Sequence, residues 1–195
     1  MSLNLSDRYS EFVATLASPN STASHKDKLL TAALGLAGES GECLELINDC
    51  VWNNNSLQKD KLIDELGDVL WYFMFALNSL ERRMADVTNF DYEYYHVATY
   101  SQEFLVQKVI KLQIHSAKFA DLVKKEVYHT KAYPVAKFLD KLHLIITTVN
   151  HICSCMELSV GKVIRLNIKK LESRYPSGKF SVEDFMKKEN AKDPE

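Results

Sequence analysis

Glycine and proline are scarce in this chain, which has six glycines and four prolines among 195 residues. Both residues interrupt helices and populate turns, so their scarcity favours long helices over a turn-rich sandwich or barrel. Hydrophobic residues make up 46% of the chain and charged residues 26%, which is typical of a folded globular protein and excludes general disorder. We therefore predict an all-α fold, organised as a single domain over residues 1–195.

The charge and the cysteines limit the partners and the compartment. A formal net charge of −2 provides no broad basic surface, so we expect no nucleic-acid or membrane partner. Residues 1–10 lack the pattern of a signal peptide, and the longest apolar run, residues 69–77, is far shorter than the ~20 residues that cross a bilayer. Four cysteines without a CxxC pair are expected to be reduced thiols, and we predict a cytoplasmic protein.

Apolar residues recur at helical spacing along most of the chain and predict six helical segments. The expected helices are a short one that ends before Pro19, followed by helices over about 25–52, 57–83, 103–129, 135–156 and 160–174. An aromatic connector over residues 89–100 and a turn over residues 175–178 should separate or follow these helices.

A weak internal repeat relates the two halves of the chain. Nine of the 55 residues over 27–81 are identical to the residue 76 positions later, whereas roughly three or four identities are expected by chance. We predict one helical pair over 27–81, a second copy of it over 103–157, and a C-terminal helical segment over 158–176. The alternative is that two unrelated amphipathic helical hairpins resemble each other.

Two pairs of carboxylates stand out within the first helical pair. Glu39 and Glu42 are three residues apart, as are Glu65 and Asp68, so each pair lies on one face of a helix. Four carboxylates brought together by two packed helices would raise one another's pKa values unless a cation neutralised them. An all-oxygen set favours Mg²⁺, or alternatively Mn²⁺, over zinc. The alternative for each pair is an ordinary solvent-exposed helix face.

Four of the six glycines lie beside these acids, at positions 35, 38, 41 and 67. Each glycine inside a helix costs about 1 kcal/mol relative to alanine. Their concentration predicts that something approaches the helix backbone closely here.

Three stretches together resemble the MazG-like nucleoside triphosphate pyrophosphohydrolases. They are residues 34–45 (LGLAGESGECLE), residues 64–72 (DELGDVLWY) and residues 167–176 (NIKKLESRYP). The family pattern is E-x-x-E, a spacer and E-x-x-D, and in this chain the spacer between the two acidic pairs runs from Cys43 to Asp64.

The resemblance implies hydrolysis of a nucleoside triphosphate to the monophosphate and pyrophosphate, dependent on Mg²⁺, in an all-α fold that usually dimerises. Glu39, Glu42, Glu65 and Asp68 would be the metal ligands. Glu42 and Glu45 would be the catalytic residues, with Glu45 orienting or activating the water that attacks the α-phosphorus. No Walker A sequence is present to hold the phosphates.

The same resemblance suggests residues that contact the substrate. Lys170 and Arg174 resemble basic positions of the family and are candidates to contact phosphates, with Asn167 beside them. As aromatic residues next to the acids, Tyr72 and Trp71 are candidates to stack on the base. The alternatives are a solvated basic helix end for the three C-terminal residues and core packing for Tyr72.

The second copy departs from the acidic pattern. In the equivalent positions it carries His115, Lys118, Lys141 and Leu144, so it cannot form the same metal site. We predict a degenerate copy, which makes a monomer with an internal pseudo-dimer the alternative to a homodimer. Two further interpretations stay open: an all-α dUTP or dCTP diphosphatase, and a non-catalytic helical module that binds nucleotide or another protein.

Overall fold

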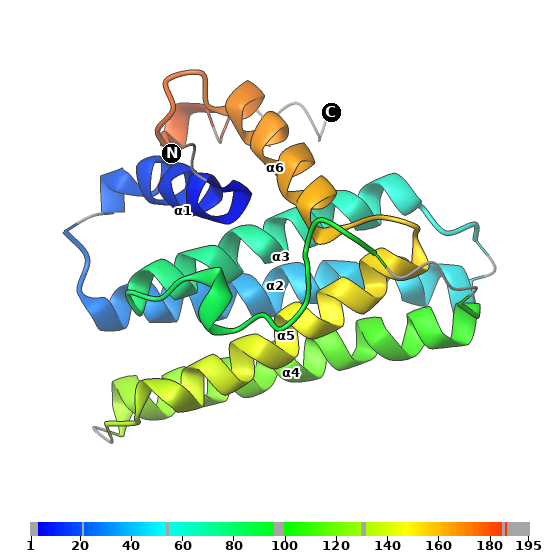
Figure 1. Ribbon diagram of the computed structural model, residues 1–195, viewed down its shortest axis with the longest axis horizontal. Coiled ribbons are helices and arrows are strands. Elements are labelled where there is room, and N and C mark those ends of the chain that lie inside the picture. The colour runs from blue at the N-terminus through cyan, green and yellow to red at the C-terminus, as the bar shows by residue number, and fades with distance from the viewer. Residues whose placement is uncertain are drawn as a thin grey trace.

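The computed structural model describes residues 4–20, 22–53, 55–95, 100–129, 132–184 and 186, and this part of the chain contains helices and no strand (Figure 1). The elements are α1 (Leu5–Leu16), η1 (Ser18–Asn20), α2 (His25–Trp52), α3 (Lys59–Ser79), η2 (Met84–Asp86), α4 (Gln102–Tyr128), α5 (Val135–Cys155) and α6 (Val160–Arg174). The all-α prediction is confirmed, and each of the six predicted helices is present close to its expected bounds.

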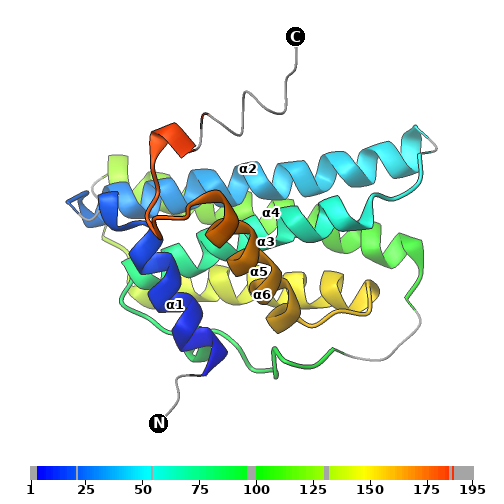
Figure 2. The same cartoon turned by 90° about the horizontal axis from the view of Figure 1, so that it is seen from above.

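Helices α2 to α5 run side by side as a long bundle, and α1 and α6 cross over it on the side of α3 (Figures 1 and 2). Helix α2 packs against both α3 and α4, and α4 packs against α5. Helices α1 and α6 contact each other as well as α3. The side chains of α6 therefore reach the helix that carries two of the predicted acids.

The core explains the unusually apolar composition of α3. Between Val69 and Leu77 every residue is buried except Trp71 and Tyr72, which are partly exposed. A helix that is apolar on most of its circumference must be covered on most sides, and α1, α2, α5 and α6 all contact α3.

Side-chain caps fix where several helices begin. The Ser24 side chain accepts a hydrogen bond from the backbone N–H of Asp27, whose carboxylate in turn accepts one from the backbone N–H of Ser24. This capping box begins α2. Ser101 and Ser159 cap α4 and α6, with their side chains accepting from the backbone N–H of the third helical residue.

The sequence repeat is accompanied by helices that begin and end at nearly equivalent residues of the two halves. Both bounds of α5 are shifted from those of α3 by the offset of the sequence repeat, and the end of α4 is shifted from the end of α2 by the same offset. That offset also separates the two non-glycine residues with positive φ in the described part, Glu81 at 55° and Glu157 at 61°, which follow α3 and α5. The equal lengths of α3 and α5 and the equivalent residues that follow them are consistent with a repeat. Whether the second pair is a degenerate copy stays a prediction.

Two remaining observations concern the thiols and the membrane. The four cysteines are free. Among the described residues no single helix is long and apolar enough to cross a bilayer, although α5 and α6, which meet at a bend of 94°, pass that test as a pair by length and composition.

Candidate active site

Three of the four predicted metal ligands lie together. Glu39 and Glu42 on α2 and Glu65 on α3 each place a carboxylate oxygen within 4.8 Å of the other two. Glu39 and Glu65 are partly buried, whereas Glu42 is exposed. The three-residue spacing on α2 and the packing of α2 against α3 produce this acidic cluster, which we define as Glu39, Glu42 and Glu65.

Two carboxyl groups of the acidic cluster, those of Glu39 and Glu65, have pKa values raised above the usual range of carboxylic acids. Burial, followed by the negative charges of Asp68, Glu42 and Glu65, raises the pKa of Glu39 to about 8, against a smaller opposing effect of Lys170. Burial, followed by the charge of Glu42, raises the pKa of Glu65 to about 7. Crowded carboxyl groups with such pKa values bind a hard divalent cation with relief of their repulsion, so the donor set fits Mg²⁺ or Mn²⁺.

Asp68, the fourth predicted ligand, is held by α6. Its Oδ1 accepts a hydrogen bond of 3.0 Å from Asn167 Nδ2, and its Oδ2 accepts one of 2.7 Å from Lys170 Nζ. Lys170 Nζ also lies 3.0 Å from Asp64 Oδ1. Asp68 is therefore outside the acidic cluster but close enough for its charge to raise the pKa of Glu39.

A buried hydrogen-bond chain continues from Asp68 to α1. The Tyr9 hydroxyl donates to Asn167 Oδ1 at 2.9 Å, and both side chains are buried, with 0% and 3% of their surface exposed. A Cβ on Gly67 would lie 2.9 Å from Asn167 Nδ2, so the glycine gives the amide room to reach Asp68. Sequence reasoning missed Tyr9, because its only signal was an apolar position at helical spacing in the first helix.

The glycines beside the acids divide into two groups. A Cβ on Gly35 would lie 2.3 Å from the Tyr72 ring, so at this position, as at Gly67, the close approach comes from the protein's own side chains. A Cβ on Gly38 would meet no atom within 4 Å, and one on Gly41 would meet only Gln113, at 3.9 Å. A side chain of the protein therefore approaches the helix backbone closely at two of the four glycines, Gly35 and Gly67.

A cavity of about 270 Å³ adjoins the acids. Glu39 and Asp68 line it, together with Tyr72 and Arg174, two of the four residues predicted to contact substrate. The other lining residues come from α1 and the residue after it, from α2, from α3 and from α6 with the segment after it: Leu16, Ala17, Thr31, Trp71, Leu171, Tyr175 and Phe180. The other two predicted contacts, Asn167 and Lys170, donate hydrogen bonds to Asp68 instead of lining the cavity.

Glu45, the predicted partner of the attacking water, is exposed on α2. It follows Glu42 by three residues and so lies about one turn further along the same helix. It is not one of the three carboxylates of the acidic cluster.

The second helical pair is basic where the first is acidic. Lys118 on α4 and Lys141 on α5 line a separate cavity of about 480 Å³. Burial, followed by the charges of Lys118 and other lysines, lowers the pKa of His115, and Leu144 is partly exposed. The four positions equivalent to the predicted metal ligands, 115, 118, 141 and 144, carry no carboxylate.

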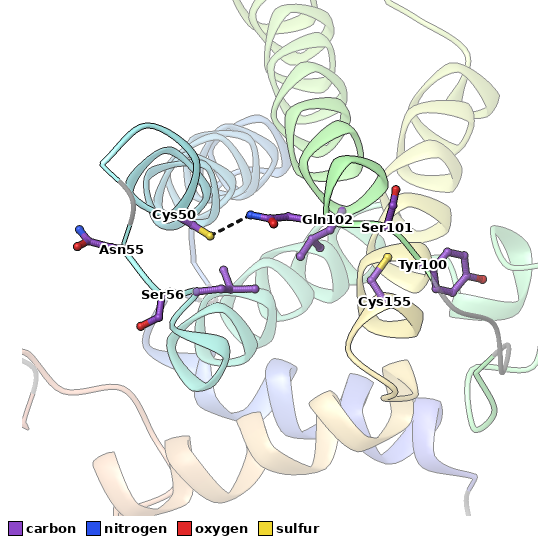
Figure 3. A pocket seen from close by; sticks show the side chains of 9 residues that line it. Cys50, Asn55, Ser56, Tyr100, Ser101, Gln102 and Cys155 are labelled. Atoms are coloured by element: carbon purple, nitrogen blue, oxygen red, sulfur yellow. Dashed lines mark hydrogen bonds between the residues drawn. The ribbon is translucent and has the colours of Figure 1, made fainter.

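A third cavity, of about 460 Å³, lies at the end of the bundle where α2, α4 and α5 come together (Figure 3). Its lining includes Cys50, Tyr100 and Cys155, and Gln102 Nε2 donates to Cys50 Sγ at 3.4 Å. It shares no lining residue with the cavity beside the acids.

The described part of the chain is therefore an all-α bundle that carries a cluster of carboxylates on two packed helices, a donor set that fits a hard divalent cation. Residues 27–93 match the family model of the MazG nucleotide pyrophosphohydrolase domain. The chain therefore contains a MazG nucleotide pyrophosphohydrolase domain, which includes α3, nearly all of α2 and all of the predicted acids. Comparisons with curated proteins and with solved structures gave no match.

Proposed function

We propose that this protein is a metal-dependent hydrolase that converts a nucleoside triphosphate to the monophosphate and pyrophosphate. The observation that carries the proposal is the acidic cluster, whose three carboxylates meet within 4.8 Å inside the matched domain. The domain assignment supplies the nucleotide class of the substrate. The partly buried, oxygen-only donor set supplies the reason for a hard cation such as Mg²⁺.

Each acid has a distinct part in this proposal. Glu39, Glu42 and Glu65 would hold the cation, and Asp68 would join them through the carboxylate lone pairs that Asn167 and Lys170 leave free. A bound Mg²⁺ would neutralise phosphate charge and lower the pKa of a water molecule.

Other residues act on the water and on the phosphates. Glu45 accepts a proton from the attacking water or orients it, from its place one turn beyond Glu42. Lys170 and Arg174 donate to phosphate oxygens, since α6 brings Lys170 beside Asp68 and Arg174 to the cavity.

The second helical pair completes the proposal for the domain. We propose that residues 103–157 are a degenerate copy that covers α2 in place of a second chain, so that residues 1–195 form one functional domain and the protein acts as a monomer. The matching helix bounds and the matching positive-φ residues Glu81 and Glu157 support this. Because the copy lacks all four acids, we place the metal in the first helical pair.

Hydrolysis in ¹⁸O-labelled water tests the reaction. Attack at the α-phosphorus puts the label in the monophosphate, whereas label in the pyrophosphate would contradict the proposed site of attack. Glu45→Gln should lower kcat by about 100-fold or more while leaving Mg²⁺ affinity unchanged, since Glu45 lies outside the acidic cluster. Equal losses of metal affinity and kcat would instead make Glu45 a ligand.

A further inference from the structure

The cavity of the second helical pair is lined mainly by charged side chains. It measures about 480 Å³, and its lining comes from α4, from α5 and from Tyr133 in the segment between them. Cations outnumber anions in this lining, which contains four lysines and two aspartates: Lys118, Lys125, Lys137, Lys141, Asp121 and Asp140. We call it the basic cavity.

The basic cavity reverses the charge of the equivalent positions in the first helical pair. Each of its charged positions has a counterpart 76 positions earlier, and together these counterparts are five acids and one lysine. Three acids of the first pair are replaced by lysines: Glu42 by Lys118, Asp49 by Lys125 and Glu65 by Lys141. Neutral residues at these positions would already remove a metal site. The lysines therefore add a property, positive charge, that the loss of a metal does not require.

Part of this positive charge is not neutralised by the protein. Asp121 pairs with Lys125 at 2.5 Å and with Lys124 at 2.8 Å. Lys118 and Lys141, in contrast, form no ion pair with any residue that the structure describes. Burial, followed by the charges of Lys118, Lys111 and Lys141, lowers the pKa of His115, so these amines lie close enough to act on one ring. A cleft with an excess of one charge concentrates ions of the opposite charge.

Contacts within the α4–α5 hairpin hold the lining in place. The backbone N–H of Tyr133 donates to Glu126 Oε2 at 2.8 Å, which ties the segment before α5 back to α4. Lys137 Nζ lies 5.1 Å from the centroid of the Tyr133 ring, within the range of a cation–π interaction. Lys137 is therefore positioned by the protein itself.

The size and the charge of the basic cavity select an anion with several charges. Lysine ammonium groups bind phosphate oxygens as point charges. A volume of about 480 Å³ lies within the range of small-molecule pockets, and its four lysines can contact more oxygens than a single phosphate offers at once. Two other cavities in the described part of the chain have less positive charge. The cavity beside the acids has one cation in its lining, Arg174, and the cavity of Figure 3 has none.

We propose that the basic cavity is a second binding site, which takes a chain of linked phosphate groups through Lys118, Lys137 and Lys141. Pyrophosphate, tripolyphosphate and the phosphate chain of a nucleotide share this chemistry. The site goes beyond the proposed function, because it shares no lining residue with the cavity beside the acids. It binds its ligand without a metal and does not depend on hydrolysis.

Isothermal titration calorimetry in EDTA tests the binding. The probes are tripolyphosphate, pyrophosphate and inorganic phosphate. Tripolyphosphate should bind saturably and at least about tenfold more tightly than inorganic phosphate, because each additional ammonium–phosphate contact contributes to the affinity. No saturable binding of tripolyphosphate, or equally tight binding of inorganic phosphate, would overturn the proposal.

Paired substitutions place the anion in the basic cavity. Lys118→Gln with Lys141→Gln should weaken tripolyphosphate binding about tenfold or more, whereas Lys118→Arg with Lys141→Arg keeps both charges and should retain it. The matched control is Lys26→Gln with Lys162→Gln, which removes two charges at exposed positions outside the basic cavity. Unchanged binding in the glutamine variant of the cavity, or an equal loss in the control, would overturn the proposal.

A substitution in the candidate active site excludes binding there. Lys170 lies beside Asp68 and not in the basic cavity, so Lys170→Gln should leave tripolyphosphate binding unchanged. A loss of binding in Lys170→Gln, without a loss in Lys118→Gln with Lys141→Gln, would move the anion to the active site and refute the second site.

Nucleoside triphosphates identify the source of the phosphate chain. Tighter binding of a nucleoside triphosphate than of tripolyphosphate, lost in the same glutamine variant, would support the site with a nucleotide as its ligand. Equal affinities, lost in the same way, would support it with a free phosphate chain. Nucleoside triphosphate binding that the glutamine variant retains in full would count against the site. A failure of the protein to release pyrophosphate in Mg²⁺ would refute the proposed function and leave this site standing.

Discussion

Replacing Glu39 with glutamine should stabilise the metal-free protein and abolish its stabilisation by Mg²⁺. The pKa of Glu39 rises from 4.5 to about 8 in the folded protein, mainly through burial. At pH 7.5 the unfolded chain has released this proton and the folded protein largely keeps it. About three pKa units correspond to ~4 kcal/mol at most, and partial solvent screening and proton sharing within the cluster reduce this to about 2 kcal/mol.

Glu39→Gln removes that cost, so the melting temperature in EDTA should rise by about 4–8 °C for a chain of this size. Thermal unfolding at pH 7.5 measures it, with and without Mg²⁺. The wild type should gain about 2.7 kcal/mol when Mg²⁺ is 100-fold above its Kd, and the variant should lose most of that gain. Glu172→Gln, at an exposed position on α6, is the control and should change neither value. A lower melting temperature in EDTA, or a full Mg²⁺ response in Glu39→Gln, would refute the reasoning.

Three further predictions concern the site and its support. Tyr9→Phe leaves the buried Asn167 Oδ1 without its donor and should lower the free energy of unfolding in urea by about 1–3 kcal/mol, whereas Tyr94→Phe, at an exposed position, should not. Gly67→Ala should lower the melting temperature despite the better helix propensity of alanine, because the new Cβ would lie 2.9 Å from Asn167 Nδ2. A higher melting temperature would contradict this and show that the Asn167 amide moves aside. In EDTA the free energy of unfolding, measured in urea, should fall as pH rises from about 5 to about 8, because folded Glu39 keeps a proton that the unfolded chain releases near pH 4.5. Mg²⁺ should flatten this pH profile. A free energy of unfolding that rises over this pH range in EDTA would contradict the raised pKa of Glu39.

The sequence predicted the helices well because their signals are local. Scarce glycine and proline and apolar spacing specify where a helix runs without reference to the rest of the chain. The acids were also predictable, since three-residue spacing on one helix places Glu39 and Glu42 on one face whatever packs beside them.

The support of the site could not be predicted, because it depends on how distant helices cross. Asp68 receives Asn167 and Lys170 only because α6 crosses α3, and Tyr9 reaches Asn167 only because α1 lies beside both. These hydrogen bonds join side chains that are 99 or more positions apart in the sequence, which local patterns do not register. Phe180 gave no local signal, since its place in the cavity depends on contacts with other parts of the chain, among them the backbone hydrogen bond to Leu16 and the ring of Tyr175.

Pyrophosphate release tests the central claim most directly. The purified protein is incubated with Mg²⁺ and a panel of ribo- and deoxyribonucleoside triphosphates, beside Glu42→Gln and a sample in EDTA. We predict release of pyrophosphate and monophosphate from at least one substrate, none in EDTA, and a rate at least about 100-fold lower for the variant. No release from any substrate, or equal rates for the wild type and Glu42→Gln, would contradict the account.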